Sequence, residues 1–111
     1  MTKIQHYSFG KYVIDGRNYE YDIKIIKGKI SSWHDHNLSL KDVKDLTEAK
    51  PEIIIIGTGA EGVIDVSEEI KNYIESKGIK LIIEKTGEAC KKYNKLEKQG
   101  KNVAAILHGT C

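Results

Sequence analysis

Cysteine and proline are scarce in this sequence, and it has no long apolar run. Among 111 residues there are two cysteines, Cys90 and Cys111, and one proline. Two thiols are too few ligands for a zinc site, and disulfides are rare in reducing compartments, so we expect both thiols to be free. Apolar runs such as Ile53 to Ile56 fall far short of the roughly 20 residues that span a bilayer. The first residues also lack the apolar segment of a signal peptide, so we expect a cytoplasmic protein.

Arginine is as scarce as proline, and charge of one sign does not dominate. Arg17 is the only arginine, the formal net charge is +2, and acidic residues are interleaved with basic ones. Proteins that read nucleic acids usually carry a basic stripe and use arginine for bidentate contacts, so nucleic-acid binding is not expected. The balance of 40% apolar and 31% charged residues is typical of one globular domain, here residues 1–111. The abundance of lysine and glutamate is compatible with a thermophilic source.

Residues 1–37 have the pattern of an antiparallel β-meander with about three or four strands. Asp15-Gly16 is a strong signal for a type I′ hairpin turn. From Tyr19 to Ile25, apolar and charged side chains alternate with the period of a half-buried strand. Lys27-Gly28-Lys29 gives a second turn signal, and a short strand is expected over residues 30–34.

Residues 38–111 are predicted to form a helix followed by a βαβαβ core. Apolar residues recur at helical spacing over residues 38–50, with Ser39 as the N-cap. Strands are then expected at residues 53–56, 79–83 and 103–107, and helices beginning at Ser67 and Thr86. Short crossovers through helices favour a parallel sheet. We therefore predict an α/β fold whose mixed, mostly parallel central sheet carries helices and is extended or flanked by an N-terminal antiparallel β-layer.

The segment Gly57-Thr58-Gly59-Ala60-Glu61-Gly62 matches the G-x-G-x-x-G pattern of dinucleotide-binding turns. In such folds the helix begins within the glycine motif, whereas here it is expected only near Ser67. A dinucleotide also needs two mononucleotide-binding halves, and the core offers three strands. A tight turn at the end of a strand is therefore the simpler interpretation. Such a turn can still line a cleft for a small ligand or an anion, with Thr58 and backbone N–H groups as contacts.

Trp33-His34-Asp35-His36 is a second cluster of chemically active residues. On an extended segment His34 and His36 point the same way, so both could reach one metal ion. The sequence places no third ligand beside them, and a polar turn before a helix explains the same residues. No metal site and no cofactor are predicted.

Cys90 is expected in the first turns of a helix, where the helix dipole lowers the pKa of a thiol. It also lies on the apolar face of that helix, and a buried cysteine is usually just a small apolar side chain. If the thiol is reactive, His108 could act as its base, and Asn94 lies one turn away.

Two C-terminal segments resemble a known family. They are the segment from Thr86 to Leu96, TGEACKKYNKL, and the segment from Val103 to His108, VAAILH. Both are similar to the C-terminal signature of a small domain-of-unknown-function family. That family includes the adipogenesis-associated domain protein and a mitochondrial complex I (NADH dehydrogenase) assembly factor. The resemblance implies a compact α/β domain with no agreed enzymatic activity and, from the eukaryotic members, a role in assisting protein assembly. The family's basic stretch and Gly-His pair after the tryptophan are replaced here by the residues that follow Trp33.

Three functions therefore stay open. The leading hypothesis is a non-enzymatic protein-interaction or assembly-assisting module, with an unknown protein partner or a second copy of the chain in a homodimer. The alternative is a small-ligand or anion site at the Gly57–Gly62 turn, and the third is a small enzyme that uses Cys90. The candidate ligand-binding residues are Gly57, Thr58, Gly59, Thr86, Cys90 and Asn94.

Overall fold

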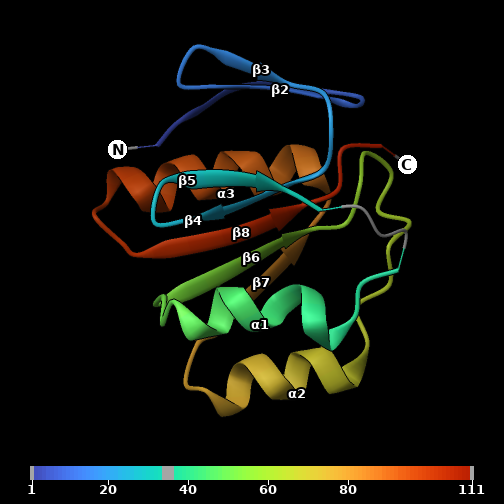
Figure 1. Cartoon of the computed structure of the whole chain (residues 1–111), viewed down its shortest axis with the longest axis vertical. Coiled ribbons are helices and arrows are strands. Elements are labelled where there is room, and N and C mark those ends of the chain that lie inside the picture. Colours follow the sequence, from blue (N-terminus) through green and yellow to red (C-terminus); the bar gives the residue numbers. More distant parts are fainter. Residues whose placement is uncertain (1, 34–36, 111) are drawn as a thin grey trace.

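The computed structural model describes residues 2–33 and 37–110, which form two β-sheets and three α-helices (Figure 1). The strands are β1 (Ile4–Ser8), β2 (Lys11–Ile14), β3 (Arg17–Tyr19), β4 (Ile23–Ile26), β5 (Lys29–Ser32), β6 (Ile53–Gly57), β7 (Lys80–Glu84) and β8 (Val103–Leu107). The helices are α1 (Leu40–Glu48), α2 (Glu68–Ser76) and α3 (Thr86–Lys98). The predicted α/β fold is confirmed.

The central sheet has the strand order β5-β4-β8-β6-β7. Strand β6 runs parallel to both β7 and β8, whereas β4 is antiparallel to β5 and β8, so the sheet is mixed. All five residues of β6 are buried. A continuous run of isoleucine suits this position because a central parallel strand is covered on both faces.

Two apolar cores lie on opposite faces of the central sheet. Helix α3 lies between one face and the three-stranded sheet β1-β2-β3, and α1 and α2 cover the other face (Figure 1). Successive side chains of a strand point to opposite faces. Accordingly, Ile53 and Ile55 pack in the α3 core, and Ile54 and Ile56 pack in the core beneath α1 and α2. Strand β6 therefore holds both layers together.

Local capping signals set the helix boundaries. Ser39 is the N-cap of α1, and its N–H donates to the Asp42 carboxylate at 2.9 Å. Ser67 is the N-cap of α2, where its hydroxyl accepts from the N–H of Ile70 at 3.2 Å. Helix α3 begins at Thr86, as predicted. The starts of α1 and α2 thus follow from capping residues beside them, whereas α3 has Lys85 at its N-cap position and no side-chain cap bond.

The predicted strand from Tyr19 to Ile25 is wrong, because the chain bends there and changes sheets. Strand β3 ends at Tyr19 and β4 begins at Ile23. Between them, the carbonyl of Asp22 accepts from the N–H of Trp33 at 3.1 Å, and its carboxylate accepts from the N–H of Gly109 at 2.7 Å. Residues 4–19 consequently form the separate sheet, and residues 23–32 form two strands of the central sheet.

The hairpin prediction at Asp15-Gly16 is confirmed. The φ angles of 50° at Asp15 and 83° at Gly16 are those of a type I′ turn. Strands β2 and β3 pair on either side of it, from Ile14 opposite Arg17 to Tyr12 opposite Tyr19.

Candidate functional site

A cleft of about 530 Å³ opens at the carboxyl end of the parallel strands. Its lining residues come from the loop after β6, from the segment before α1 and from the residues after β8: Asn37, Leu38, Val63, Ile64, Asp65, His108 and Thr110. In open α/β sheets, ligands gather at the carboxyl ends of the strands. The position and size of this cleft are those of a small-molecule site.

One of the lining residues, His108, forms a largely buried pair with Asp22. His108 Nδ1 lies 2.7 Å from Asp22 Oδ2, and both side chains are largely buried. Because a carboxylate can only accept, Nδ1 carries the hydrogen in this contact and Nε2 faces away from Asp22. The hydroxyl of Thr110, which also lines the cleft, lies 3.4 Å from Nε2. The pair thus orients the imidazole with Nε2 beside another polar group.

Neighbouring groups fix the position of this imidazole. The indole Nε1 of Trp33 donates to the carbonyl of Leu107 at 3.2 Å, and the centres of the Trp33 and His108 rings are 6.4 Å apart. The Tyr7 hydroxyl and the Gly10 N–H both donate to the carbonyl of Gly109, at 2.8 and 2.7 Å. The segment after β8 is therefore held by residues from β1, from the turn after it and from the segment after β5.

Three of the predicted residues come together next to the cleft. The hydroxyl of Thr86 donates to the carbonyl of His108 at 2.6 Å and accepts from the N–H of Gly59 at 2.9 Å. A Cβ on Gly57 would lie 2.8 Å from Leu107 Cδ2 and 2.9 Å from Thr86 Oγ1. Glycine at this position therefore allows β6, β8 and the start of α3 to approach closely.

The backbone N–H groups of the turn are mostly used within the protein. Those of Thr58, Ala60 and Gly62 donate to the carbonyls of Glu84, Thr110 and Gly59, and the N–H of Gly59 donates to Thr86. The hydroxyl of Thr58 also donates to the backbone carbonyl of Glu84, at 3.2 Å. The N–H groups predicted to bind an anion are thus largely bonded already, and no residue of the turn lines the cleft.

The structure also explains why this turn is no dinucleotide fingerprint. Helix α2 begins only at Glu68, beyond the glycine motif, so the motif does not lead directly into a helix. The carboxylate of Glu84 pairs with Lys92 of α3. Both features agree with the simpler interpretation of a tight turn.

Cys90 lies apart from this cleft and is not activated. Its side chain is 5% exposed in the core between α3 and the separate sheet. Burial raises the pKa of the thiol to about 12, which agrees with the interpretation of Cys90 as a small apolar side chain. His108, considered as its base, pairs with Asp22 instead.

Asn94 connects α3 to the first strand. Its amide donates to the carbonyl of Ile4 at 2.7 Å, and its oxygen accepts from the N–H of Ile4 at 2.8 Å. Both polar ends of the side chain are thus used in holding β1 against the helix. The six predicted residues therefore divide into a group beside the cleft and the pair Cys90 and Asn94 on α3.

Asp22 was not predicted as a site residue, and His108 was considered only as a base for Cys90. The two residues are 86 positions apart, so no local pattern links them. One available signal was the position of His108 directly after the apolar strand β8, at the carboxyl end of the strands, where ligands of α/β sheets bind.

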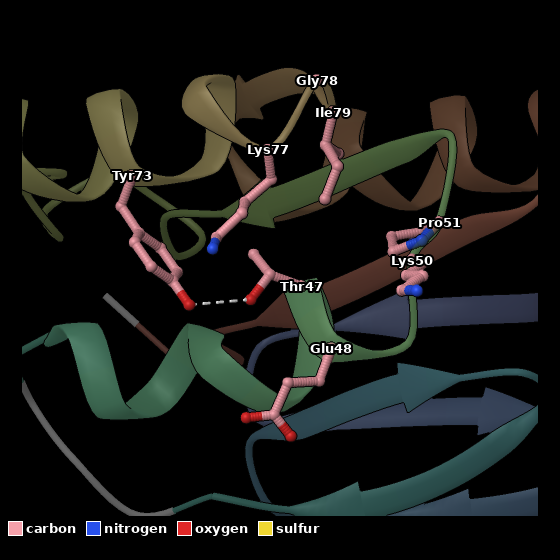
Figure 2. A pocket seen from close by; sticks show the side chains of 8 residues that line it. All are labelled: Thr47, Glu48, Lys50, Pro51, Tyr73, Lys77, Gly78 and Ile79. Atoms are coloured by element: carbon pink, nitrogen blue, oxygen red, sulfur yellow. Dashed lines mark hydrogen bonds between the residues drawn. The ribbon is translucent and has the colours of Figure 1, made fainter.

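A second hollow of about 500 Å³ lies at the opposite end of the parallel strands, where β6 and β7 begin (Figure 2). The hydroxyl of Thr47 donates to the carbonyl of Lys44, so the Tyr73 hydroxyl is the donor in its 3.2 Å contact with Thr47. The ammonium group of Lys77 lies 5.4 Å from the centre of the Tyr73 ring. These contacts link α1 to α2, and Glu48 points away from them (Figure 2). We interpret this hollow as a by-product of helix packing.

The described residues hold neither a cluster of metal-ligating side chains nor a membrane-spanning helix. Among residues 2–33 and 37–110, no group of three or more His, Cys, Asp or Glu side chains is placed to hold a metal ion. His34 and His36, considered from the sequence as possible ligands, lie outside these residues. In the same part of the chain, no helix is long and apolar enough to cross a membrane.

Comparisons with known proteins agree on the fold. A 13 kDa major membrane protein of Francisella tularensis subsp. holarctica (strain LVS) is 28% identical over 108 residues, covering 93% of this chain and 87% of that protein. The structure of a conserved hypothetical protein of Pyrococcus horikoshii OT3 has a TM-score of 0.84 at 28% identity, covering 98% of this chain and 99% of that chain. An outer membrane protein from Bartonella henselae has a TM-score of 0.88 at 24% identity, covering 99% and 96% of the two chains.

A family model described as "Protein of unknown function (DUF498/DUF598)" matches residues 4–108. The match includes all the strands and helices described above, since β1 begins at Ile4 and β8 ends at Leu107. The chain therefore belongs to the DUF498/DUF598 family.

Proposed function

We propose that this protein binds a small polar molecule in the cleft at the carboxyl end of its central sheet. The observation that carries the proposal is the largely buried pair of Asp22 and His108, which sets Nε2 of the ring beside the Thr110 hydroxyl, and in the neutral ring this nitrogen accepts. Burying two polar side chains is costly unless they are hydrogen-bonded. Here the pair is bonded on its inner side, and the outer side of the ring borders an open cleft of ligand size.

The chemistry of the cleft favours a ligand that donates hydrogen bonds. Its polar lining comprises an imidazole acceptor, the carboxylate of Asp65, and the side chains of Asn37 and Thr110. Leu38, Val63 and Ile64 supply an apolar wall. None of the described residues that line the cleft is lysine or arginine. A hydroxyl- or amine-bearing molecule therefore fits better than the anion considered from the sequence.

Native mass spectrometry of the freshly purified, untagged protein tests this proposal. We expect an adduct of metabolite mass, or one formed on adding small polyols and amines, that is lost in His108→Gln. The glutamine amide can still donate to Asp22, but it has no ring nitrogen at the position of Nε2. The control is Tyr73→Phe in the second hollow, which should retain the adduct. Adducts that persist equally in both variants would contradict the proposal.

A protein-interaction or assembly-assisting role is the second candidate, and the likeness to assembly-factor relatives first suggested it. It is supported by two exposed apolar side chains, Phe9 at 65% and Val63 at 67% exposure. The turn that carries Phe9 and the loop that carries Val63 are both bonded to the segment after β8. The N–H of Gly10 donates to the carbonyl of Gly109, and the N–H of Ala60 donates to the carbonyl of Thr110. If a protein partner binds this end, Phe9→Ser should weaken the complex and leave small-molecule binding unchanged.

An enzyme that uses Cys90 gains no support from the position of this residue, because the thiol is buried and its pKa is raised. A cytoplasmic location stays a prediction from the sequence.

A further inference from the structure

The outer edge of β7 is an unpaired edge of the central sheet. Strand β7 ends the sheet order, and in the described part of the chain it pairs only with β6 (Figure 1). The N–H of Lys80 donates to the carbonyl of Glu52 at 3.1 Å, and the carbonyl of Glu84 accepts from the N–H of Thr58 at 2.9 Å, so both residues bond toward β6. In a parallel ladder alternate residues face the same neighbour. The peptide groups of Leu81 and Ile83 therefore face outward, away from β6.

This edge carries few of the features that usually block further pairing. Proteins protect exposed edges with proline, bulges or charged side chains within the strand. The register of β7 with β6 runs without a shift from Lys80 to Glu84, and its middle residues, Leu81, Ile82 and Ile83, are all partly exposed. Charged residues stand only at its two ends. Such an edge is able to accept another strand.

We infer that a second copy of this chain pairs with β7 in an antiparallel arrangement centred on Ile82. Strand β7 has the sequence Lys-Leu-Ile-Ile-Glu, so it begins with a positive residue and ends with a negative one. Two antiparallel copies of it therefore bring opposite charges together. Pairing about Ile82 sets Lys80 opposite the partner's Glu84, and Glu84 opposite the partner's Lys80. A two-fold interface brings the same patch of both copies together, so both charged contacts form at once. A register shifted by one residue would set Lys80 opposite an isoleucine or a lysine.

The same register satisfies the outward peptide groups. Leu81 faces the partner's Ile83, and because both residues point their N–H and carbonyl groups outward, they form a hydrogen-bonded pair. Symmetry forms the equivalent pair on the other side of the axis. The two central sheets then join into one continuous sheet.

Side chains on both faces of this joint sheet are suited to the contact. Ile82 packs at the margin of the core on the α3 side, and Leu81 and Ile83 pack at the margin of the core beneath α1 and α2. Pairing extends both cores across the axis and covers these partly exposed side chains. Glu84 already pairs with Lys92, so in the dimer its carboxylate lies between two ammonium groups.

Charge exchange tests this register. Sedimentation of the untagged full chain, from micromolar to millimolar concentration, should show a reversible dimer. Lys80→Glu and Glu84→Lys each set like charges opposite one another at both ends, so each should weaken dimerisation by about tenfold. An equimolar mixture of the two variants should restore association, because every cross-strand pair is then Glu opposite Lys. Lys80 is exposed, so the first variant should keep the fold and its circular dichroism spectrum.

Hydrogen exchange supplies an independent measurement on the wild type. The amides of Leu81 and Ile83 should become protected as concentration rises, whereas the amide of Ile82, already bonded to β6, should not change. A chain that stays monomeric at millimolar concentration would overturn the inference. So would single variants that associate as well as the wild type, or a mixture that associates no better than its components.

Discussion

At the scale of single residues, two tyrosines near the cleft differ in how their hydroxyls are satisfied. The Tyr7 hydroxyl donates to the carbonyl of Gly109 at 2.8 Å. The Tyr12 hydroxyl is fully buried and has no hydrogen-bond partner among the described residues. Burial raises the pKa of both phenols, that of Tyr7 to about 12. An unpaired buried hydroxyl loses its bonds to water without a replacement.

The paired phenylalanine variants should therefore shift stability in opposite directions. We expect Tyr12→Phe to raise the free energy of unfolding by up to about 1 kcal/mol, since it removes an unsatisfied group. Tyr7→Phe should lower it by about 1 kcal/mol, because it leaves the Gly109 carbonyl with one donor fewer. Urea denaturation of both variants measures the difference. A loss of stability in Tyr12→Phe equal to that in Tyr7→Phe would show that the Tyr12 hydroxyl is bonded in solution.

Cys90 gives a second prediction at this scale. Only the thiolate is alkylated, and burial raises the pKa of Cys90 from 9.0 to about 12. At pH 8 the folded Cys111→Ser variant should react with iodoacetamide more than about a hundredfold slower than the same variant unfolded in urea. The rate should rise with pH throughout the alkaline range, since thiolate is scarce below the raised pKa. Equal rates for the folded and unfolded variant would restore Cys90 as a candidate nucleophile.

At the scale of secondary-structure elements, Gly57 allows β6 to lie close to β8 and to the start of α3. A methyl group on Gly57 would meet Leu107 and Thr86 within 3.0 Å, so we expect Gly57→Ala to lower the free energy of unfolding by about 1–3 kcal/mol. Gly87, in the first turn of α3, is a matched control, because a Cβ there meets nothing within 4 Å. Gly87→Ala should be neutral or stabilising by up to about 1 kcal/mol. Thermal unfolding of the two variants checks the contrast, and equal effects would refute the close approach.

The elements also show what could be predicted from the sequence and why. Helices α1 to α3 and strands β6 to β8 were predictable because caps such as Ser39 and Ser67, and apolar periodicity, are properties of neighbouring residues. The break at Asp22 was not, because its bonds to Trp33 and Gly109 depend on the tertiary fold. The alternation of side chains continues through the break and gives no sign of it.

The region of the candidate site followed from the sequence, but its lining did not, because none of the six predicted residues lines the cleft. The glycine turn and Thr86 follow from the rule that ligands bind at the carboxyl ends of strands, and the structure places them beside the cleft. Asp22 was missed because its partner, His108, lies at the other end of the chain. The burial of Cys90, by contrast, was indicated by its place on the apolar face of the predicted helix, and the separate β-sheet packed over α3 covers that face.

At the scale of the whole molecule, the central sheet has different surroundings at its two ends and at its outer edge. The carboxyl end of the parallel strands carries the cleft and the exposed side chains of Phe9 and Val63. The opposite end carries the hollow beside Tyr73, where side chains mainly link α1 to α2 (Figure 2). The outer edge of β7 pairs with no other strand among the described residues, and it is the edge to which we assign the second copy. Ligand binding and dimerisation would thus use separate surfaces, so each can be tested without disturbing the other.

Chemical-shift mapping on the isotope-labelled protein tests the central claim most directly. Titration with a set of small polyols and amines should move the signals of His108, Thr110 and the loop from Val63 to Asp65, and leave those of Thr47 and Tyr73 unchanged. His108→Gln should abolish these shifts while the rest of the spectrum is retained. Shifts confined to the hollow beside Tyr73, or the same shifts in His108→Gln, would contradict the assignment of the ligand site to the cleft.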